Sequence, residues 1–93
     1  MKFEYDPEKS LLNKIKHGID FEEAQALWSD KYALQLFARS DIEPRFMVIG
    51  RIDRKLWSAF VTFRSDRVRI ISVRRSRKQE ELIYGKALIR RGT

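Results

Sequence analysis

Cysteine is absent from this 93-residue sequence, which also contains one histidine, two prolines and four glycines. The chain can therefore form neither disulfides nor thiolate metal sites, and a single histidine is too few for the usual zinc sites. No apolar run approaches the roughly 20 residues that cross a bilayer, and residues 1–7 lack the apolar stretch of a signal peptide. We expect a cytoplasmic protein with no metal site, no cofactor and no membrane contact.

Positive charge is the strongest compositional feature of the chain. Twenty Lys and Arg oppose 13 Asp and Glu, which gives a formal net charge of +7 and a pI near 10.1. Basic side chains release condensed counterions from a phosphate backbone, so this surplus favours a nucleic acid or an acidic protein as partner. The alternative is that the charge serves only solubility. A chain of this length is expected to form one domain, residues 1–93, with a thin core and a shallow surface site.

Hydrophobic periodicity predicts an α+β domain in which helices pack against an antiparallel β-sheet, with the order β-α-α-β-β-β-β-α. We expect a short edge strand at 3–5, a helix from Pro7 that ends at Gly18, and a second helix between Asp20 and Ser29. Four strands in an antiparallel meander are expected at 32–37, 45–52, 56–63 and 67–74. A third helix is expected to open at Ser76.

Polar residues mark where these helices begin. Asp6 precedes a proline, which is typical of an N-cap followed by the first helical residue. Asp20 with Glu23, and Ser76 with Gln79, have the three-residue spacing of a capping box. Apolar residues three or four apart are expected to face the sheet; they are Leu11, Leu12 and Ile15, then Ala24, Leu27 and Trp28, then Leu82, Ile83 and Leu88.

The last predicted strand carries a basic strip. Strict alternation places Val68, Ile70, Ser72 and Arg74 on one face and Arg67, Arg69, Ile71 and Val73 on the other. Both faces contain arginine, so the strand cannot be wholly buried. One interpretation is a strand with solvated ends. The other is a strip that contacts RNA phosphates and continues into the third helix; its candidate residues are Arg67, Arg69, Arg75, Arg77 and Lys78.

Lys16 and His17 stand just before the glycine that ends the first helix. His17 is the only side chain whose ordinary pKa allows proton exchange near neutral pH. The simpler interpretation is that both residues only complement the negative end of the helix dipole. The chain lacks cysteine, a glycine-rich phosphate loop and a Ser-His-Asp set, so an enzyme built from it would work with His, Lys, Arg, Tyr and Glu.

Cleavage of RNA through its own 2′-hydroxyl suits that set of residues, because the substrate supplies the nucleophile. The protein then needs a base, an acid and cations that stabilise the phosphorane. His17 or Glu80 could act as the base, and Tyr84 or a lysine could act in proton transfer. Arg45 and Arg74 could hold the phosphate through paired hydrogen bonds.

The order of these residues resembles the BrnT family of bacterial toxins over roughly residues 3 to 84. The N-terminal match reads Phe3-x-Tyr5-Asp6-Pro7-x-Lys9-x-x-x-Asn13-x-x-Lys16-His17-Gly18-Ile19-x-Phe21-Glu22-Glu23-Ala24. Later matches are Arg45, Ile49-Gly50, Arg69-Ile70-Ile71-Ser72-Val73-Arg74, Glu80 and Tyr84.

This resemblance implies the toxin of a type II toxin–antitoxin system, a ribonuclease with a RelE-like fold that inhibits translation. It also implies neutralisation by a BrnA-like antitoxin with a ribbon-helix-helix domain, in a complex that represses its operator DNA. The active residues carried over by matching motif are Lys16, His17, Arg45, Arg74 and Tyr84. An alternative function is a non-catalytic basic partner that helps an antitoxin to occupy operator DNA.

Overall fold

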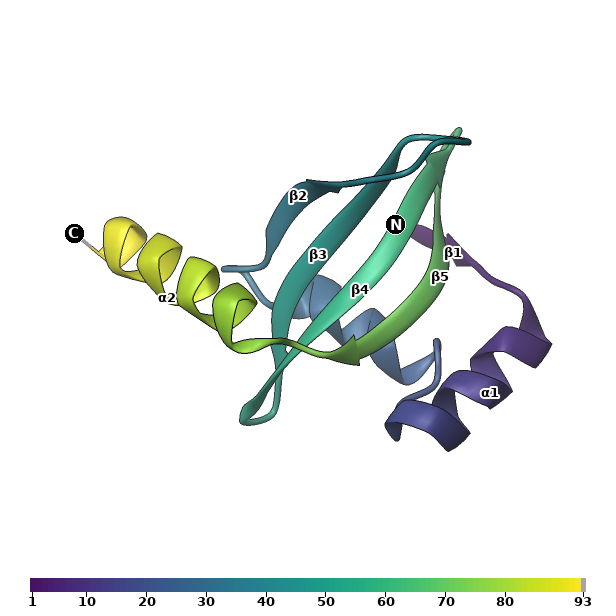
Figure 1. Ribbon diagram of the computed structural model, residues 1–93, viewed down its shortest axis with the longest axis horizontal. Coiled ribbons are helices and arrows are strands. Elements are labelled where there is room, and N and C mark those ends of the chain that lie inside the picture. The colour runs from purple at the N-terminus through teal and green to yellow at the C-terminus, as the bar shows by residue number, and fades with distance from the viewer. Residues whose placement is uncertain (93) are drawn as a thin grey trace.

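The computed structural model describes residues 1–92 and has a mixed α+β architecture built on a five-stranded sheet (Figure 1). This confirms the expected fold class. The elements are β1 (Lys2–Glu4), α1 (Pro7–His17), the 3-10 helix η1 (Glu23–Ser29), β2 (Leu34–Ala38), β3 (Arg45–Ile52), β4 (Lys55–Arg64), β5 (Arg67–Arg75) and α2 (Lys78–Gly92). The second helical segment is therefore a 3-10 helix, and it carries Ala24 and Leu27 into the core as expected.

The strand order in the sheet is β1-β5-β4-β3-β2. Strands β2 to β5 form the expected antiparallel meander. The sheet as a whole is mixed, however, because β1 pairs in parallel with β5, opposite residues 67–69. Two strands joined directly by a hairpin must pair antiparallel. Between β1 and β5, however, the chain passes through both helical segments and the rest of the meander, so β5 is free to lie parallel to β1.

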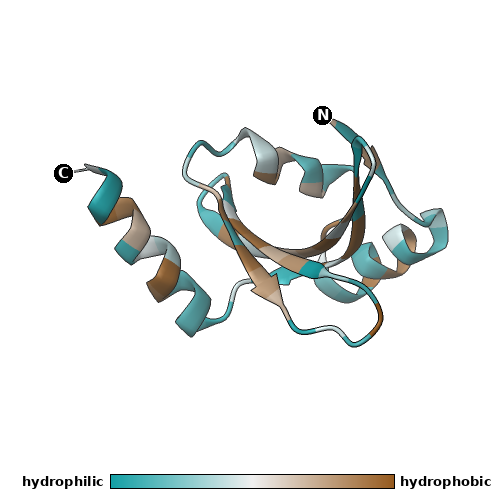
Figure 2. Ribbon diagram, turned by 90° about the horizontal axis from the view of Figure 1, so that it is seen from above, coloured by the Kyte–Doolittle hydropathy of each residue, from teal (hydrophilic) through white to brown (hydrophobic). Residues whose placement is uncertain are grey.

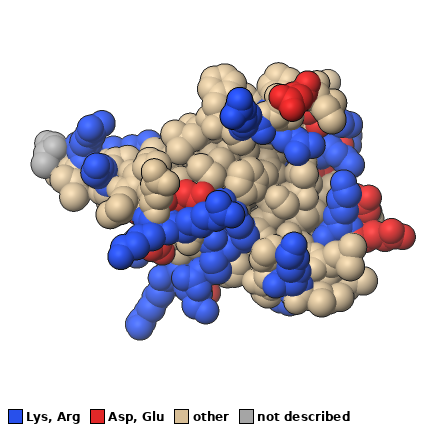
Figure 3. All heavy atoms as spheres, in the orientation of Figure 1, with Lys and Arg blue, Asp and Glu red and all other residues tan. Residues whose placement is uncertain are grey.

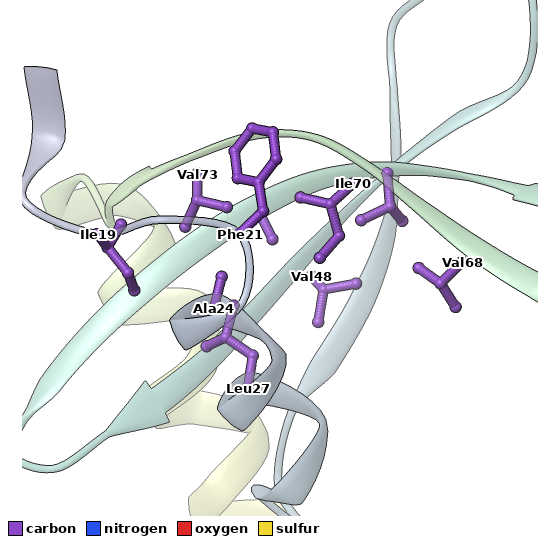
Figure 4. Close-up of a cluster of buried hydrophobic side chains, with 10 residues drawn as sticks. Ile19, Phe21, Ala24, Leu27, Val48, Val68, Ile70 and Val73 are labelled. Atoms are coloured by element: carbon purple, nitrogen blue, oxygen red, sulfur yellow. The ribbon is translucent and has the colours of Figure 1, made fainter. Parts of the chain in front are cut away.

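The core lies between the sheet and the segment formed by η1 and the loop that joins it to α1 (Figure 4). Phe21 and Leu27 are almost fully buried there against strand residues such as Ile70. Figure 2 shows η1 against the sheet and α2 projecting away from it. One face of the sheet is thus covered by η1 and the loop before it, α1 lies along the edge of β5, and the other face is left to α2 alone.

Helix α1 docks by hydrogen bonds, which corrects the expectation of an apolar contact. Leu11, Leu12 and Ile15 are 63%, 62% and 74% exposed, whereas Ser10 and Asn13 are buried. The Asn13 amide donates to the Val73 carbonyl (2.9 Å) and accepts from the Val73 amide (3.2 Å). Because β1 pairs with β5 only as far as residue 69, the backbone of Val73 lies on a free strand edge and requires such a partner.

Helix α2 also departs from its expected packing. Leu82 and Ile83 are exposed by 58% and 39%, while Glu80 and Tyr84 are buried. The expected capping box of Ser76 with Gln79 is not the one that forms. Glu80 accepts from the Arg77 amide (2.9 Å), and the Ser76 hydroxyl pairs with Ser58 instead. The box of Asp20 with Glu23 is confirmed by reciprocal bonds of 2.7 and 3.0 Å.

A bulge in β5 overturns the expected assignment of its two faces. Phe60 lies opposite Ser72, but Val61 lies opposite Ile70, so Ile71 is an extra residue on β5. The alternation therefore changes phase at this point. Val68, Ile70 and Val73 are buried together on the core side. The opposite side carries Arg69, Ser72 and Arg74, which face the same way as Thr62, Phe60 and Ser58 of β4.

Candidate nucleic-acid interface

The sheet face turned away from α1 and η1 is called the open face here. Figure 3 shows it as an uncharged hollow with Lys and Arg gathered around it. Register places these residues on it: Arg45, Met47, Ile49, Ser58, Phe60, Thr62, Arg69, Ser72 and Arg74. Met47, Phe60 and Ser72 are half-buried in its middle. The open face is therefore a shallow surface with an apolar centre and a cationic rim, as a single-stranded nucleic acid requires.

Arg74 lies on this rim and is held in place by Glu80. Two parallel hydrogen bonds join them, from Nη1 to Oε1 and from Nη2 to Oε2, each 2.8 Å long. Glu80 also accepts from the Ser58 hydroxyl (2.7 Å), a residue of the open face. The Arg74 guanidinium lies 5.2 Å from the centre of the Phe60 ring. Arg74 is thus a fixed, half-exposed cation beside an aromatic surface.

These contacts decide the ionisation of Glu80. Hydrogen bonding from Arg74, helped by the Arg77 amide and the Ser58 hydroxyl, outweighs burial and lowers the pKa of Glu80 from 4.5 to about 2. A carboxylate this acidic is a weak proton acceptor near neutral pH. The structure therefore favours Glu80 as a residue that positions Arg74 and argues against its use as a general base.

Arg45 and Arg69 occupy the other end of the open face, on either side of Thr62 in one row across β3, β4 and β5. Arg69 pairs with Glu4 at 2.8 Å. Within residues 1–92, the buried Nε of Arg45 has no hydrogen-bond partner. The Arg45 row is four strand residues from the row of Arg74, or roughly 13 Å.

Tyr84 is an anchor for α2 in this structure. Its side chain is 3% exposed, and its hydroxyl donates to Asp30 at 2.8 Å. Burial and the bond to Asp30 raise the pKa of Tyr84. Burial would by itself raise the pKa of Asp30 as well, but bonds from the Tyr32 and Arg51 amides and from Tyr84 leave it lowered. A hydroxyl so enclosed cannot touch an RNA bound to the surface.

Lys16 and His17 lie in the last turn of α1, beside the C-terminal end of β5 (Figure 1). Gly18 ends the helix with a φ of 81°, and its amide donates to the Lys14 carbonyl. Asn13 is level with Val73, and His17 follows it by one turn on the same helix face. That is about 6 Å further along the helix.

A second surface begins at this helix end. It is a cleft of about 410 Å³ lined by Gly18, Ile19, Glu23, Ile52, Asp53, Arg54, Lys55 and Trp57. The Arg75 guanidinium lies 5.5 Å from the centre of the Trp57 ring. Trp57 and Arg75 are register partners that face the core side of the sheet, so this cleft opens on the side opposite to Arg74.

The structure therefore divides the residues that the sequence grouped together. Arg69 and Arg74 share the open face, while Arg75 faces the other way and Arg67 lies exposed at the far hairpin. Arg77 and Lys78 are exposed at the start of α2. His17, Arg45, Arg74 and Tyr84, which the family resemblance names together as active residues, do not lie at one place. Arg74 and His17 lie near one end of β5, Arg45 lies at the opposite end of the open face, and Tyr84 is enclosed.

Several residues of this surface were not singled out by sequence reasoning. From the sequence, Phe60 looks like one more core residue. It is partly exposed because α2 leaves the middle of the open face uncovered. Ser58 carried a usable signal, since a serine at a fully buried position in an apolar strand needs a partner. Asp30 caps the C-terminal end of η1, and its carboxylate also accepts hydrogen bonds from the Tyr32 and Arg51 amides and from the Tyr84 hydroxyl.

Among residues 1–92, no three histidine, cysteine, aspartate or glutamate side chains gather closely enough to hold a metal ion. In the same part of the chain, no helix is both long enough and apolar enough to span a membrane.

Comparison with known proteins gives one family. A family model described as the ribonuclease toxin, BrnT, of type II toxin–antitoxin systems matches residues 5–80. The matched span includes Lys16, His17, Arg45 and Arg74, and it ends before Tyr84. No curated protein matches the sequence.

Proposed function

This chain belongs to the BrnT family of ribonuclease toxins of type II toxin–antitoxin systems, and we propose that it is a metal-independent endoribonuclease that binds RNA across its open face. The observation that carries the proposal is the Arg74–Glu80 pair, which fixes a half-exposed guanidinium beside Phe60. A rigid cation next to an aromatic ring can stack on a base and bind the adjoining phosphate.

The proposed reaction is transesterification. The 2′-oxygen attacks the neighbouring phosphorus, the bond to the 5′-oxygen breaks, and the products are a 2′,3′-cyclic phosphate and a 5′-hydroxyl. One proton leaves the 2′-hydroxyl and one is delivered to the departing 5′-oxygen. Arg74 stabilises the negative charge that grows on the phosphorane, and Arg45 binds a second phosphate further along the strand.

Lys16 and His17 are assigned to proton transfer at the edge of β5, where the RNA would leave the open face beside Arg74. His17 suits this role because an imidazole can both accept and donate a proton. Glu80 is assigned to positioning and Tyr84 to anchoring. Arg69 is included among the RNA-binding residues of the open face. Arg67, Arg75, Arg77 and Lys78 are proposed to make only general electrostatic contacts with the strand outside it.

The test is cleavage of a defined single-stranded RNA by the purified protein in EDTA. We expect fragments that end in 2′,3′-cyclic phosphate, and growth arrest when the protein is produced without its antitoxin. Intact RNA beside an active control ribonuclease, with normal growth, would contradict the proposal. Cleavage that requires added magnesium would contradict the metal-independent mechanism.

The proposal extends to a BrnA-like antitoxin with a ribbon-helix-helix domain, and to repression of the operator by the complex. The charge of the chain supports an acidic partner. A mobility shift of operator DNA should appear with antitoxin and strengthen when this protein is added. A shift without any growth defect would favour the non-catalytic alternative.

A further inference from the structure

Helix α2 and strand β2 enclose a second groove, of about 390 Å³, that no part of the described chain fills. Its floor is aliphatic and consists of Leu34, Leu36, Ile83 and Ala87. Its rim is cationic and consists of Lys86, Arg90 and Arg91. This groove is called the α2–β2 groove below.

The apolar surface continues beyond the groove onto α2. Leu82 and Ile89 are 58% and 69% exposed and lie on the helix surface next to Lys86. In Figures 1 and 2 this helix projects from the sheet. Its first turns contact Arg74 and Asp30, and near its end Arg91 donates to the Lys31 carbonyl at 3.3 Å. A surface helix normally turns its apolar side chains inward, so a contiguous exposed patch of this kind is typical of a binding surface.

The chemistry of the groove distinguishes among possible occupants. Its lining has no aromatic ring on which a base could stack, which disfavours RNA. A second copy of this chain would bring a net charge of +7 against the same cationic rim. A helix with leucine-type side chains on one side and carboxylates flanking them would satisfy both the floor and the rim.

We propose that the α2–β2 groove is the docking surface for an acidic amphipathic helix of the antitoxin. The inference rests on the proposed function, in which this chain is a toxin with such a partner. Neutralisation follows from the position of the groove. Leu36 pairs with Met47, and Met47 pairs with Phe60, so the groove floor continues into the open face. A helix docked there would border the RNA surface and bring carboxylates beside it.

The experiment compares two exposed isoleucines on different helices, using the antitoxin encoded beside the toxin gene as the probe. Ile83→Glu places a carboxylate in the groove, and Ile15→Glu places one on α1, where the native residue is 74% exposed. In calorimetric titration we expect Ile83→Glu to weaken binding by at least about 10-fold, a loss of about 1.4 kcal/mol, and Ile15→Glu to bind as the wild type does. Lys86→Glu should also weaken binding, and the loss should shrink at high salt.

Other outcomes would overturn the inference. They are equal affinity of all variants, a loss with Ile15→Glu as large as with Ile83→Glu, or antitoxin-induced protection from hydrogen exchange that misses residues 34–36 and 83–91. A free chain that is dimeric and becomes monomeric with Ile83→Glu would assign the groove to a second copy. Loss of RNA binding by Ile83→Glu in the absence of antitoxin would assign it to RNA. Because antitoxin binding is measured separately, a wild-type chain that binds antitoxin but cleaves no RNA would defeat only the proposed function.

Discussion

Arg74 and Glu80 face each other across the turn between β5 and α2, joined by two parallel hydrogen bonds of 2.8 Å. The first turn of α2 is therefore part of the candidate RNA surface. Glu80 completes the N-terminal end of the helix through the Arg77 amide and at the same time fixes the guanidinium beside Phe60. Helix initiation and the orientation of the cation thus depend on the same carboxylate.

Replacing Glu80 should impair cleavage by releasing Arg74. In Glu80→Gln the charged, two-point contact is lost, so we expect the cleavage rate to fall by about 10-fold or more. The measurement is the initial rate of RNA cleavage at neutral pH, with Glu81→Gln, an exposed neighbour, as the matched control. Wild-type rates in a folded Glu80→Gln variant would show that Arg74 needs no positioning.

The same pair should make stability depend on acid pH. The pKa of Glu80 is about 2 in the folded protein against an ordinary 4.5, so its contribution is complete above about pH 5 and is lost as the pH falls toward 2. The difference corresponds to about 3 kcal/mol in the unfolding free energy. Urea unfolding at pH 6 and pH 3 should show about 2 kcal/mol of this fall in the wild type, because pH 3 is still above the folded pKa, and a smaller fall in Glu80→Gln. Equal falls in the two proteins would contradict it.

Tyr84 should matter to stability and not to chemistry. Tyr84→Phe removes one buried hydrogen bond and leaves Asp30 with one donor fewer, which should cost about 1 to 2 kcal/mol. We expect a lower unfolding midpoint with cleavage kept near the wild-type rate. A Tyr84→Phe protein that folds but no longer cleaves RNA would show that the hydroxyl takes part in catalysis.

Docking of α1 should depend on its asparagine. Asn13→Ala exposes the unpaired edge of Val73 and removes the contact with the Ile19 carbonyl, and we expect a loss of about 2 to 3 kcal/mol. Leu12→Ala is the control, since Leu12 is 62% exposed and its truncation should change stability little. If Leu12→Ala lost more stability than Asn13→Ala in urea unfolding, the result would show that α1 docks through its apolar residues.

The ends of the first helix and the antiparallel meander could be predicted because local rules determine them. Asp6 caps α1 through the Glu8 amide and Gly18 ends it in the left-handed region, as their positions in the sequence indicated. The docking face of α1 could not be predicted in the same way. Periodicity marks apolar residues, whereas the edge that Asn13 occupies exists only because β1 stops short along β5.

The candidate site was harder to predict because it depends on a bulge and on an uncovered face. One extra residue at Ile71 moves Arg74 away from Ile70 and onto the open face, and strict alternation cannot show such a shift. The sequence proposed Tyr84 for proton transfer, and only the fold shows that its hydroxyl donates to Asp30. The sequence did identify Arg45, Arg69 and Arg74 as candidate phosphate ligands, and all of them lie on the open face.

The central claim is that RNA is cleaved on the open face, and two adjacent arginines test it most directly. Arg74 faces this side of the sheet, and Arg75 faces the other side against Trp57. The measurement is the cleavage rate of one RNA in EDTA by Arg74→Gln and by Arg75→Gln. We predict a loss on the order of 100-fold for Arg74→Gln and a rate near that of the wild type for Arg75→Gln. Equal rates for the two variants, or a larger loss for Arg75→Gln, would contradict the account.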